Sequence, residues 1–173
     1  YPIAIFGVLR AGLTVVNTNP MYTARELKHQ LTDSGATVLL VMENFAATVQ
    51  EIIKETKVKQ VITTSIGEML GAKGLLINFM LKYVKNAVPS YDLPGSITFK
   101  NALSLGGKHS LPSIDLRHED IAFLQYTGGT TGVAKGAMLS HGNLVANMLQ
   151  SSAWLGHDLK PGLEIIITAL PLY

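Results

Sequence analysis

One segment in the second half of the chain gathers residue types that bind phosphate. Residues 127–136 contain four glycines, three threonines and one lysine. Glycines let backbone N–H groups approach an anion closely, threonine hydroxyls donate further hydrogen bonds, and Lys135 adds a full positive charge. An ordinary turn needs only one or two glycines. We therefore interpret the cluster as a polyphosphate site, with an ordinary loop as the alternative.

The segment departs from the two most widespread phosphate-binding motifs. The P-loop requires Ser or Thr directly after its lysine, whereas Gly136 follows Lys135. The dinucleotide fingerprint requires a residue between its first two glycines, whereas Gly128 and Gly129 are adjacent. Residues 137–139 predict a short strand and no helix. The loop's own amides, hydroxyls and lysine must therefore attract the anion, because no helix dipole is expected there.

The sequence of residues 126–144 is YTGGTTGVAKGAMLSHGNL. It resembles the phosphate loop of adenylate-forming enzymes, whose usual form is [YF]-T-S-G-[ST]-T-G-x-P-K-G. That group includes acyl-CoA synthetases, luciferases and peptide-synthetase adenylation domains. Gly128 replaces the usual Ser, and Ala134 replaces the usual Pro. Both changes are similar to those of bacterial long-chain fatty-acid–CoA ligases. So are residues 15–36, VVNTNPMYTARELKHQLTDSGA, and the final TALPLY.

The resemblance implies a two-step reaction that uses a fatty acid, ATP with Mg²⁺, and coenzyme A. A carboxylate attacks the α-phosphorus of ATP to give acyl-adenylate and pyrophosphate, and the thiol of coenzyme A then displaces AMP. Loop donors are expected to stabilise the charge that develops on pyrophosphate. We assign catalytic roles to Thr131 and Lys135, and we assign no metal ligand. The predicted nucleotide-binding residues are Tyr126, Thr127, Gly128, Gly129, Thr130, Thr131, Gly132, Lys135 and Gly136.

The resemblance covers only part of an adenylate-forming enzyme. The sequence lacks the adenine-binding Y-G-x-T-E, the ribose-binding aspartate motif, the hinge and the C-terminal catalytic lysine of the family. We therefore expect residues 1–173 to be an incomplete, inactive portion of the N-terminal AMP-binding domain, without the C-terminal domain. Two alternatives stay open: another adenylate-forming ligase, such as an aryl-CoA ligase or a peptide-synthetase domain, and a non-catalytic nucleotide-binding module.

Composition narrows the classes of partner. A net charge of +2, without basic runs interleaved with aromatics, argues against nucleic acid. The absence of cysteine excludes disulfides, thiolate metal sites and a cysteine nucleophile. Apolar runs stay far below the roughly 20 residues that span a bilayer, and no signal peptide is visible. We expect a cytoplasmic protein, and the oligomeric state is not predicted.

Hydrophobic periodicity predicts an α/β fold. Residues 3–64 alternate helix and strand three times, which is typical of a parallel sheet layer with crossover helices. Thr23 and Glu26 form a capping box ahead of a helix that ends at Gly35. Residues 38–42 are apolar without alternation, which predicts a strand buried on both faces. The helix over residues 3–9 is also expected to be buried.

The rest of the chain gives further expectations. Ser140 is predicted to cap a helix, Trp154 to lie in a core, and Asn44 to cap a helix earlier in the chain. Residues 101–112 predict a loop and residues 164–169 a strand. The apolar residues expected on the inward face of the helix after Ser140 are Leu144, Val145, Met148 and Leu149.

An amphipathic helix is predicted over residues 75–84, where large apolar residues recur at helical spacing; Lys73, Lys82 and Lys85 lie within or beside this segment. It has two interpretations: packing against further protein, or lying on a membrane surface as a peripheral contact with the inner membrane. His109, His118 and His157 lack metal-ligand spacing, and His141 is expected to start a helix.

Overall fold

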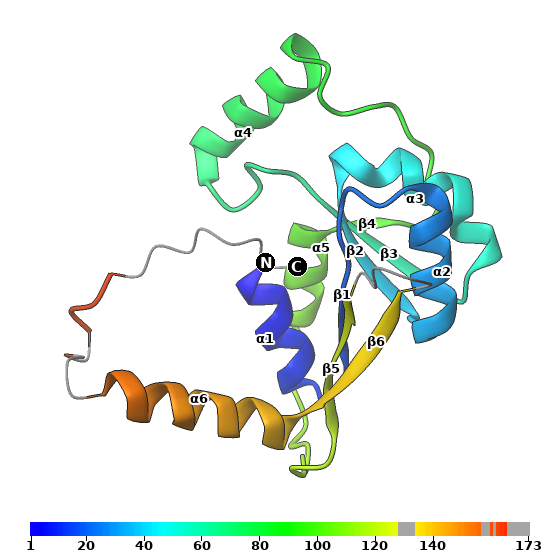
Figure 1. The fold of residues 1–173 in the computed structure, drawn as a ribbon. Coiled ribbons are helices and arrows are strands. Elements are labelled where there is room, and N and C mark those ends of the chain that lie inside the picture. The colour runs from blue at the N-terminus through cyan, green and yellow to red at the C-terminus, as the bar shows by residue number, and fades with distance from the viewer. Residues whose placement is uncertain (128–133, 157–159, 161, 166–173) are drawn as a thin grey trace. The chain divides into compact units, whose positions relative to one another are not determined.

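The computed structural model describes residues 1–127, 134–156, 160 and 162–165. The chain divides into unit 1, made of Tyr1–Asn17 and Pro112–Tyr173, and unit 2, made of Thr18–Leu111. The described residues of each unit contain a three-stranded sheet with helices (Figure 1). The predicted α/β class is therefore confirmed.

The elements in chain order are α1 (Pro2–Arg10), β1 (Val15–Asn17), α2 (Ala24–Ser34), β2 (Val38–Met42), η1 (Glu43–Phe45), α3 (Ala46–Ile52), η2 (Ile53–Glu55), β3 (Gln60–Thr64), α4 (Gly71–Phe79), η3 (Met80–Val84), β4 (Ile97–Thr98), α5 (Phe99–Gly106), β5 (Ile121–Thr127), β6 (Lys135–Ser140) and α6 (His141–Leu155).

Unit 2 is built on the parallel sheet β2-β3-β4, as the alternation of helix and strand predicted. Leu39 of β2 and Val61 of β3 are buried in one cluster with apolar residues of α2 and α3. Both helices lie beside this sheet in Figure 1. Burial of these side chains supplies the main stabilising term for the unit, at about 25 cal/mol per Å² of apolar surface. The cluster comprises Leu27, Leu31, Leu39, Ala46, Val49, Ile52, Val61 and Leu93.

Helix α2 begins and ends where its local chemistry predicts. The Thr23 hydroxyl accepts a hydrogen bond from the Glu26 backbone N–H at 3.4 Å. The Glu26 carboxylate accepts one from the Thr23 N–H at 2.9 Å, which completes the capping box. The Thr23 hydroxyl also donates to the Glu26 carboxylate at 2.7 Å, and this bond, followed by the one from the Thr23 N–H, lowers the pKa of the Glu26 carboxyl. Gly35 ends the helix with a φ of 66°, a left-handed conformation that glycine adopts without strain.

Three expectations for unit 2 are wrong. The strand β2 is buried on one face only, since Val38 is 53% exposed while Leu39 lies in the core. Asn44 does not cap α3, because its Nδ2 instead donates to the carbonyl of Ala87 at 2.6 Å. The loop expected over residues 101–112 begins inside α5, whose N-terminus is capped by the Thr98 hydroxyl.

Unit 1 contains the sheet β1-β5-β6, in which β1 and β5 run parallel and β5 and β6 antiparallel. Strand β1 therefore belongs to a different sheet from β2 and β3, although the three follow one another in the sequence. Thr14 Oγ1 donates to the carbonyl of Ile121 at 3.0 Å and joins the beginnings of β1 and β5. Gly12 ends the turn after α1 with a φ of 69°.

The helices of unit 1 carry more exposed apolar surface than the sequence predicted. Phe6 of α1 is 70% exposed and Trp154 of α6 is 88% exposed, so neither is a core residue in this chain. Ser140 caps α6 as expected, in a capping box with Asn143. Val145, Met148 and Leu149 of the expected inward face are nevertheless exposed. The physical reason is that none of the described residues covers that face.

The expected strand at residues 164–169 is not tested over most of its length. Residues 166–169 lie outside the described part of the chain, and Glu164 and Ile165 do not belong to a strand.

Candidate phosphate-binding hairpin

The predicted phosphate loop joins two antiparallel strands. The last described pairs of the β5–β6 ladder are Tyr126 with Gly136 and Thr127 with Lys135. Residues 128–134 therefore connect the strands of a hairpin. The predicted site residues Gly128, Gly129, Thr130, Thr131 and Gly132 lie outside the described residues.

Thr127 and Lys135 lie directly opposite each other at the end of this hairpin that leads into the loop. Directly paired residues of neighbouring strands project from the same face of the sheet, with Cβ atoms about 4.5–5.5 Å apart. Both residues are exposed. The structure therefore presents a hydroxyl and an ammonium group side by side where the two strands enter the loop, an arrangement suited to an anion.

Tyr126 and Gly136 form the neighbouring pair and project from the opposite face, because successive strand residues alternate. Tyr126 is 8% exposed, and a Cβ atom on Gly136 would lie 2.9 Å from Cε2 of its ring. The absence of a side chain at Gly136 thus makes room for the tyrosine ring. This packing accounts for the glycine independently of the predicted contact with phosphate.

A row of polar side chains that the sequence did not predict adjoins the pair Thr127 and Lys135. The hydroxyl of Tyr1 donates to Oδ1 of Asn17 at 2.8 Å, and Nδ2 of Asn17 donates to Oε1 of Gln125 at 3.2 Å. Partial burial raises the pKa of the Tyr1 hydroxyl, an effect that its hydrogen bond with Asn17 opposes. Asn17 and Gln125 are 108 positions apart, so no local pattern signals their contact.

Comparison with known proteins places the chain in a family. The family model described as AMP-binding enzyme matches residues 1–173. The chain belongs to the AMP-binding enzyme family. The resemblance of the loop to adenylate-forming enzymes is thereby confirmed.

Several curated relatives of this chain share one name, long-chain-fatty-acid–CoA ligase. The chain is 54% identical over 174 residues to a long-chain-fatty-acid–CoA ligase of Escherichia coli O157:H7. That match covers 100% of this chain and 31% of the relative. It is 35% identical over 175 residues to the long-chain-fatty-acid–CoA ligase of Bacillus subtilis, where the match covers 99% of this chain and 30% of the relative. The chain thus spans about a third of the length of these relatives.

Solved structures agree on the fold. A long-chain-fatty-acid-CoA ligase of Archaeoglobus fulgidus is 30% identical, with a TM-score of 0.60 over 90% of this chain and 26% of that one. An anthranilate CoA ligase crystallised with anthranoyl-AMP has the same TM-score of 0.60 at 21% identity, over 80% of this chain and 22% of its own. At that identity the likeness concerns the fold alone.

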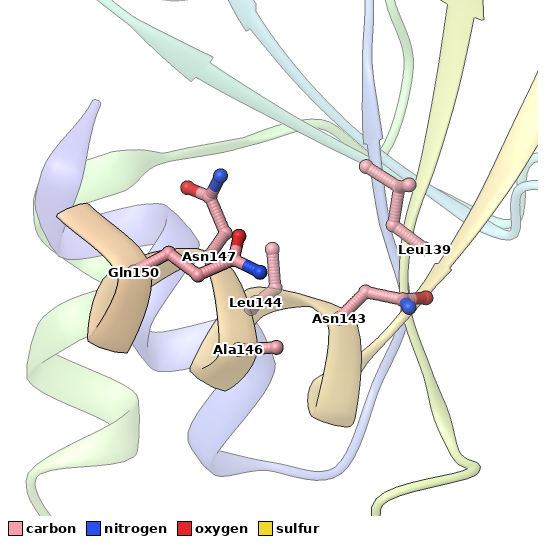
Figure 2. A pocket seen from close by; sticks show the side chains of 6 residues that line it. All are labelled: Leu139, Asn143, Leu144, Ala146, Asn147 and Gln150. Carbon is pink, nitrogen blue, oxygen red and sulfur yellow. The ribbon is translucent and has the colours of Figure 1, made fainter.

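The described part of the chain also contains a hollow in unit 1, apart from the Thr127 and Lys135 pair. Figure 2 shows it beside the first turns of α6 and the end of β6, lined by three amide side chains and apolar neighbours. The side chain of Asn143 is already engaged in the capping box with Ser140. Leu139 pairs with Phe123, four residues from the Thr127 and Lys135 pair. The hollow is therefore separate from the candidate site.

His141 and Asp120 have structural roles near the start of α6. His141 is the first residue of α6, as expected, and its backbone N–H donates to the carbonyl of Asp120 at 2.9 Å. The Asp120 carboxylate accepts from the Arg117 N–H at 2.7 Å and so closes a loop. Within the described residues, no three His, Cys, Asp or Glu side chains form a group able to hold a metal ion. The prediction for His157 lies outside those residues.

Proposed function

We propose that this chain is part of a long-chain fatty-acid–CoA ligase. The observation that carries the proposal is the Thr127 and Lys135 pair, which flanks a loop of the adenylate-forming type in a chain 54% identical to a ligase of that name. In this proposal a fatty-acid carboxylate oxygen bonds to the α-phosphorus of ATP, and pyrophosphate leaves with the electrons of the broken P–O bond. The thiol of coenzyme A then attacks the acyl carbon, and AMP leaves.

The hairpin would act in the first step. Thr127 and Lys135 would bind phosphate oxygens together with the loop residues Gly128, Gly129, Thr130, Thr131 and Gly132. Negative charge grows on pyrophosphate as its bond breaks, so donors held in place stabilise the transition state more than the bound substrate. Thr131 and Lys135 have the catalytic roles in this scheme.

Magnesium is proposed as the companion of ATP and not as a resident ion of this chain. Proteins hold such an ion through one or two carboxylates together with substrate phosphates. Residues 127–136 contain no carboxylate, and among the described residues no three His, Cys, Asp or Glu side chains form a group able to hold a metal ion. The hairpin itself therefore offers no carboxylate to magnesium, and we derive no step through the ion.

Exchange of labelled pyrophosphate into ATP by the full-length enzyme tests the proposal. Palmitate is expected to support exchange and coumarate is not. Exchange with coumarate alone would favour an aryl-CoA ligase, and exchange with an amino acid alone would favour a peptide-synthetase adenylation domain. Absence of exchange with every acid would favour the non-catalytic nucleotide-binding module.

We further propose that the enzyme is cytoplasmic and touches the inner membrane through the exposed side of α4 and η3. Helix α4 is held on one side by Asn78, whose Oδ1 accepts from the Gly67 N–H at 2.8 Å and whose Nδ2 donates to Ser65 at 2.8 Å. Gly74, one turn earlier, packs against Gly67 so closely that a Cβ atom would collide with its carbonyl. The exposed apolar residues of α4 and η3 are Leu75, Leu76, Phe79, Met80, Tyr83 and Val84.

Charge favours an anionic lipid surface as the occupant of this face. Between Glu68 and Asp92 the sequence has three lysines and no acidic residue. Lys82 lies 5.9 Å from the ring centre of Tyr83, and that ring packs 5.1 Å from Phe79. Apolar side chains bordered by lysines are typical of helices that lie in the membrane interface. None of the described helices combines the length and apolar character needed to cross a bilayer.

Flotation of the full-length enzyme with vesicles tests this contact, using phosphatidylcholine with and without phosphatidylglycerol. Phe79→Ser with Met80→Ser is expected to abolish flotation, and Lys82→Gln with Lys85→Gln to remove its dependence on phosphatidylglycerol. Trp154→Ser is the control, because Trp154 is equally apolar and more exposed but lies in α6. Unchanged flotation of the apolar variant, or no flotation of the wild type, would mean that further protein covers this face.

A further inference from the structure

Asn17 and Gln125 form the last pair of the β1–β5 ladder in the described part of the chain, next to the strand end that leads into the phosphate loop. Strand β1 ends at Asn17, which pairs with Gln125 in the parallel ladder. Beyond this pair, β5 continues through Tyr126 to Thr127, which pair with Gly136 and Lys135 of β6. Whatever holds Gln125 in place therefore acts on the strand end that carries Thr127.

On one face of the β1–β5 ladder, the paired side chains change from apolar to polar toward the loop. The preceding pair on the same face is Val15 with Phe123, and the next one is Asn17 with Gln125. Thr127 follows on the same face, about 7 Å further along the strand at 3.3–3.4 Å per residue. Apolar side chains could fill this half-buried position equally well. Packing alone therefore does not explain why two amide side chains stand here.

The hydrogen bonds also set the direction of both amides. Asn17 Oδ1 accepts from the Tyr1 hydroxyl, so its Nδ2 is the group turned toward Gln125. Gln125 then accepts through Oε1, which leaves its NH₂ group directed away from Asn17. A relay of three side chains thus holds Gln125 in one orientation, two residues before Thr127.

We propose that Asn17 and Gln125 are positioning residues for the Thr127 and Lys135 pair, and that Tyr1 orients them. They tether the end of β5 to β1, so that Thr127 keeps its place opposite Lys135 when pyrophosphate leaves. The inference rests on the proposed adenylation by this hairpin. Displacement of a catalytic group by about 1 Å can lower the rate by up to roughly 10², so loss of a tether this close to Thr127 is expected to lower kcat.

The test compares Asn17→Leu and Gln125→Met with Thr14→Val in the full-length enzyme. Thr14→Val is a matched control because it also removes a hydrogen bond between β1 and β5, at the end of the strands remote from the loop. Pyrophosphate exchange at saturating palmitate gives kcat and the KM for ATP, and thermal melting gives stability. Asn17→Leu and Gln125→Met are each expected to lower kcat about tenfold. Thr14→Val is expected to leave kcat unchanged.

Two further variants distinguish loss of the tether from general misfolding. The double variant Asn17→Leu with Gln125→Met is expected to be no slower than either single one, because both remove the same tether. Tyr1→Phe, which removes a single oxygen, is expected to lower kcat about twofold to threefold. The inference is overturned if the tether variants and Thr14→Val change melting alike and leave kcat at the wild-type value. Failure of the proposed function has a different result, namely no exchange by the wild type.

Discussion

The two sheets of this chain differ in how much apolar surface they bury. In unit 2, the β2-β3-β4 sheet shares a cluster of eight buried side chains with its helices and loops. Among the described residues of unit 1, the buried apolar ones are Val15, Ala122 and Tyr126, and long side chains of α1 and α6 are exposed. The candidate site lies on the less buried sheet. Segments that bind ligands are commonly drawn from the less stable parts of a protein, because they must be free to adjust.

The largest effect is expected in unit 1, on rate rather than on stability. Lys135→Ala and Thr131→Ala in the full-length enzyme should each slow pyrophosphate exchange by about 10²–10³, or roughly 3–4 kcal/mol, because phosphate loses a donor whose contact strengthens in the transition state. The KM for palmitate should change little. Lys108→Ala, at an exposed lysine of unit 2, is the control. Wild-type exchange by both loop variants would show that the loop does not bind the leaving pyrophosphate.

Removal of a buried side chain from unit 2 should lower the stability of the protein. Leu31 is 1% exposed in the centre of the cluster, so Leu31→Ala is expected to lower the free energy of unfolding by about 2–5 kcal/mol. Trp154→Ala removes a larger side chain from exposed α6 and should cost less than about 0.5 kcal/mol. Urea denaturation followed by circular dichroism measures both. Equal losses would mean that the two units are buried to the same extent in solution.

A smaller loss is expected from Gly136→Ala, where the added Cβ would press against the ring of Tyr126 at 2.9 Å. Forcing the ring aside should cost about 1–3 kcal/mol of stability. Gly106→Ala is the matched control, because nothing lies within 4 Å of a Cβ at that position. Thermal melting of the two variants decides the matter. If Gly136→Ala melts like the control, the packing explanation for this glycine fails.

The smallest effect concerns the capping box of α2. Thr23→Ala should lower stability by about 1 kcal/mol. Because hydrogen bonds from Thr23 hold the pKa of Glu26 below its ordinary value of 4.5, their contribution is complete above that pH and is lost as the pH falls through the lowered pKa. The difference in melting temperature between wild type and Thr23→Ala should therefore shrink in acid. A difference that stays constant from neutral to strongly acid pH would contradict this account.

Local chemistry explains which expectations are confirmed. The caps at Thr23 and Ser140 depend on a residue three positions away, and Gly35 ends α2 through its own backbone conformation. Helix α5 was not predicted because it has only eight residues and its cap, Thr98, is itself the last residue of a two-residue strand, although Phe99, Ala102 and Leu103 stand at helical spacing. The assignment of the loop residues to phosphate binding stays a prediction. The structure shows that Thr127 and Lys135 lie opposite each other at the two ends of the loop.

Sequence by itself determined the features whose causes lie within a few residues: the helix caps, the strand over Val38–Met42, and a loop rich in glycine and threonine that ends in Lys135. Tertiary structure decided which strands pair and which side chains meet. Strand β1 joins β5 across most of the chain, and that pairing brings Asn17 to Gln125. It also decided that Trp154 and Phe6 are exposed, because burial depends on what covers a face and not on the apolar character of the face.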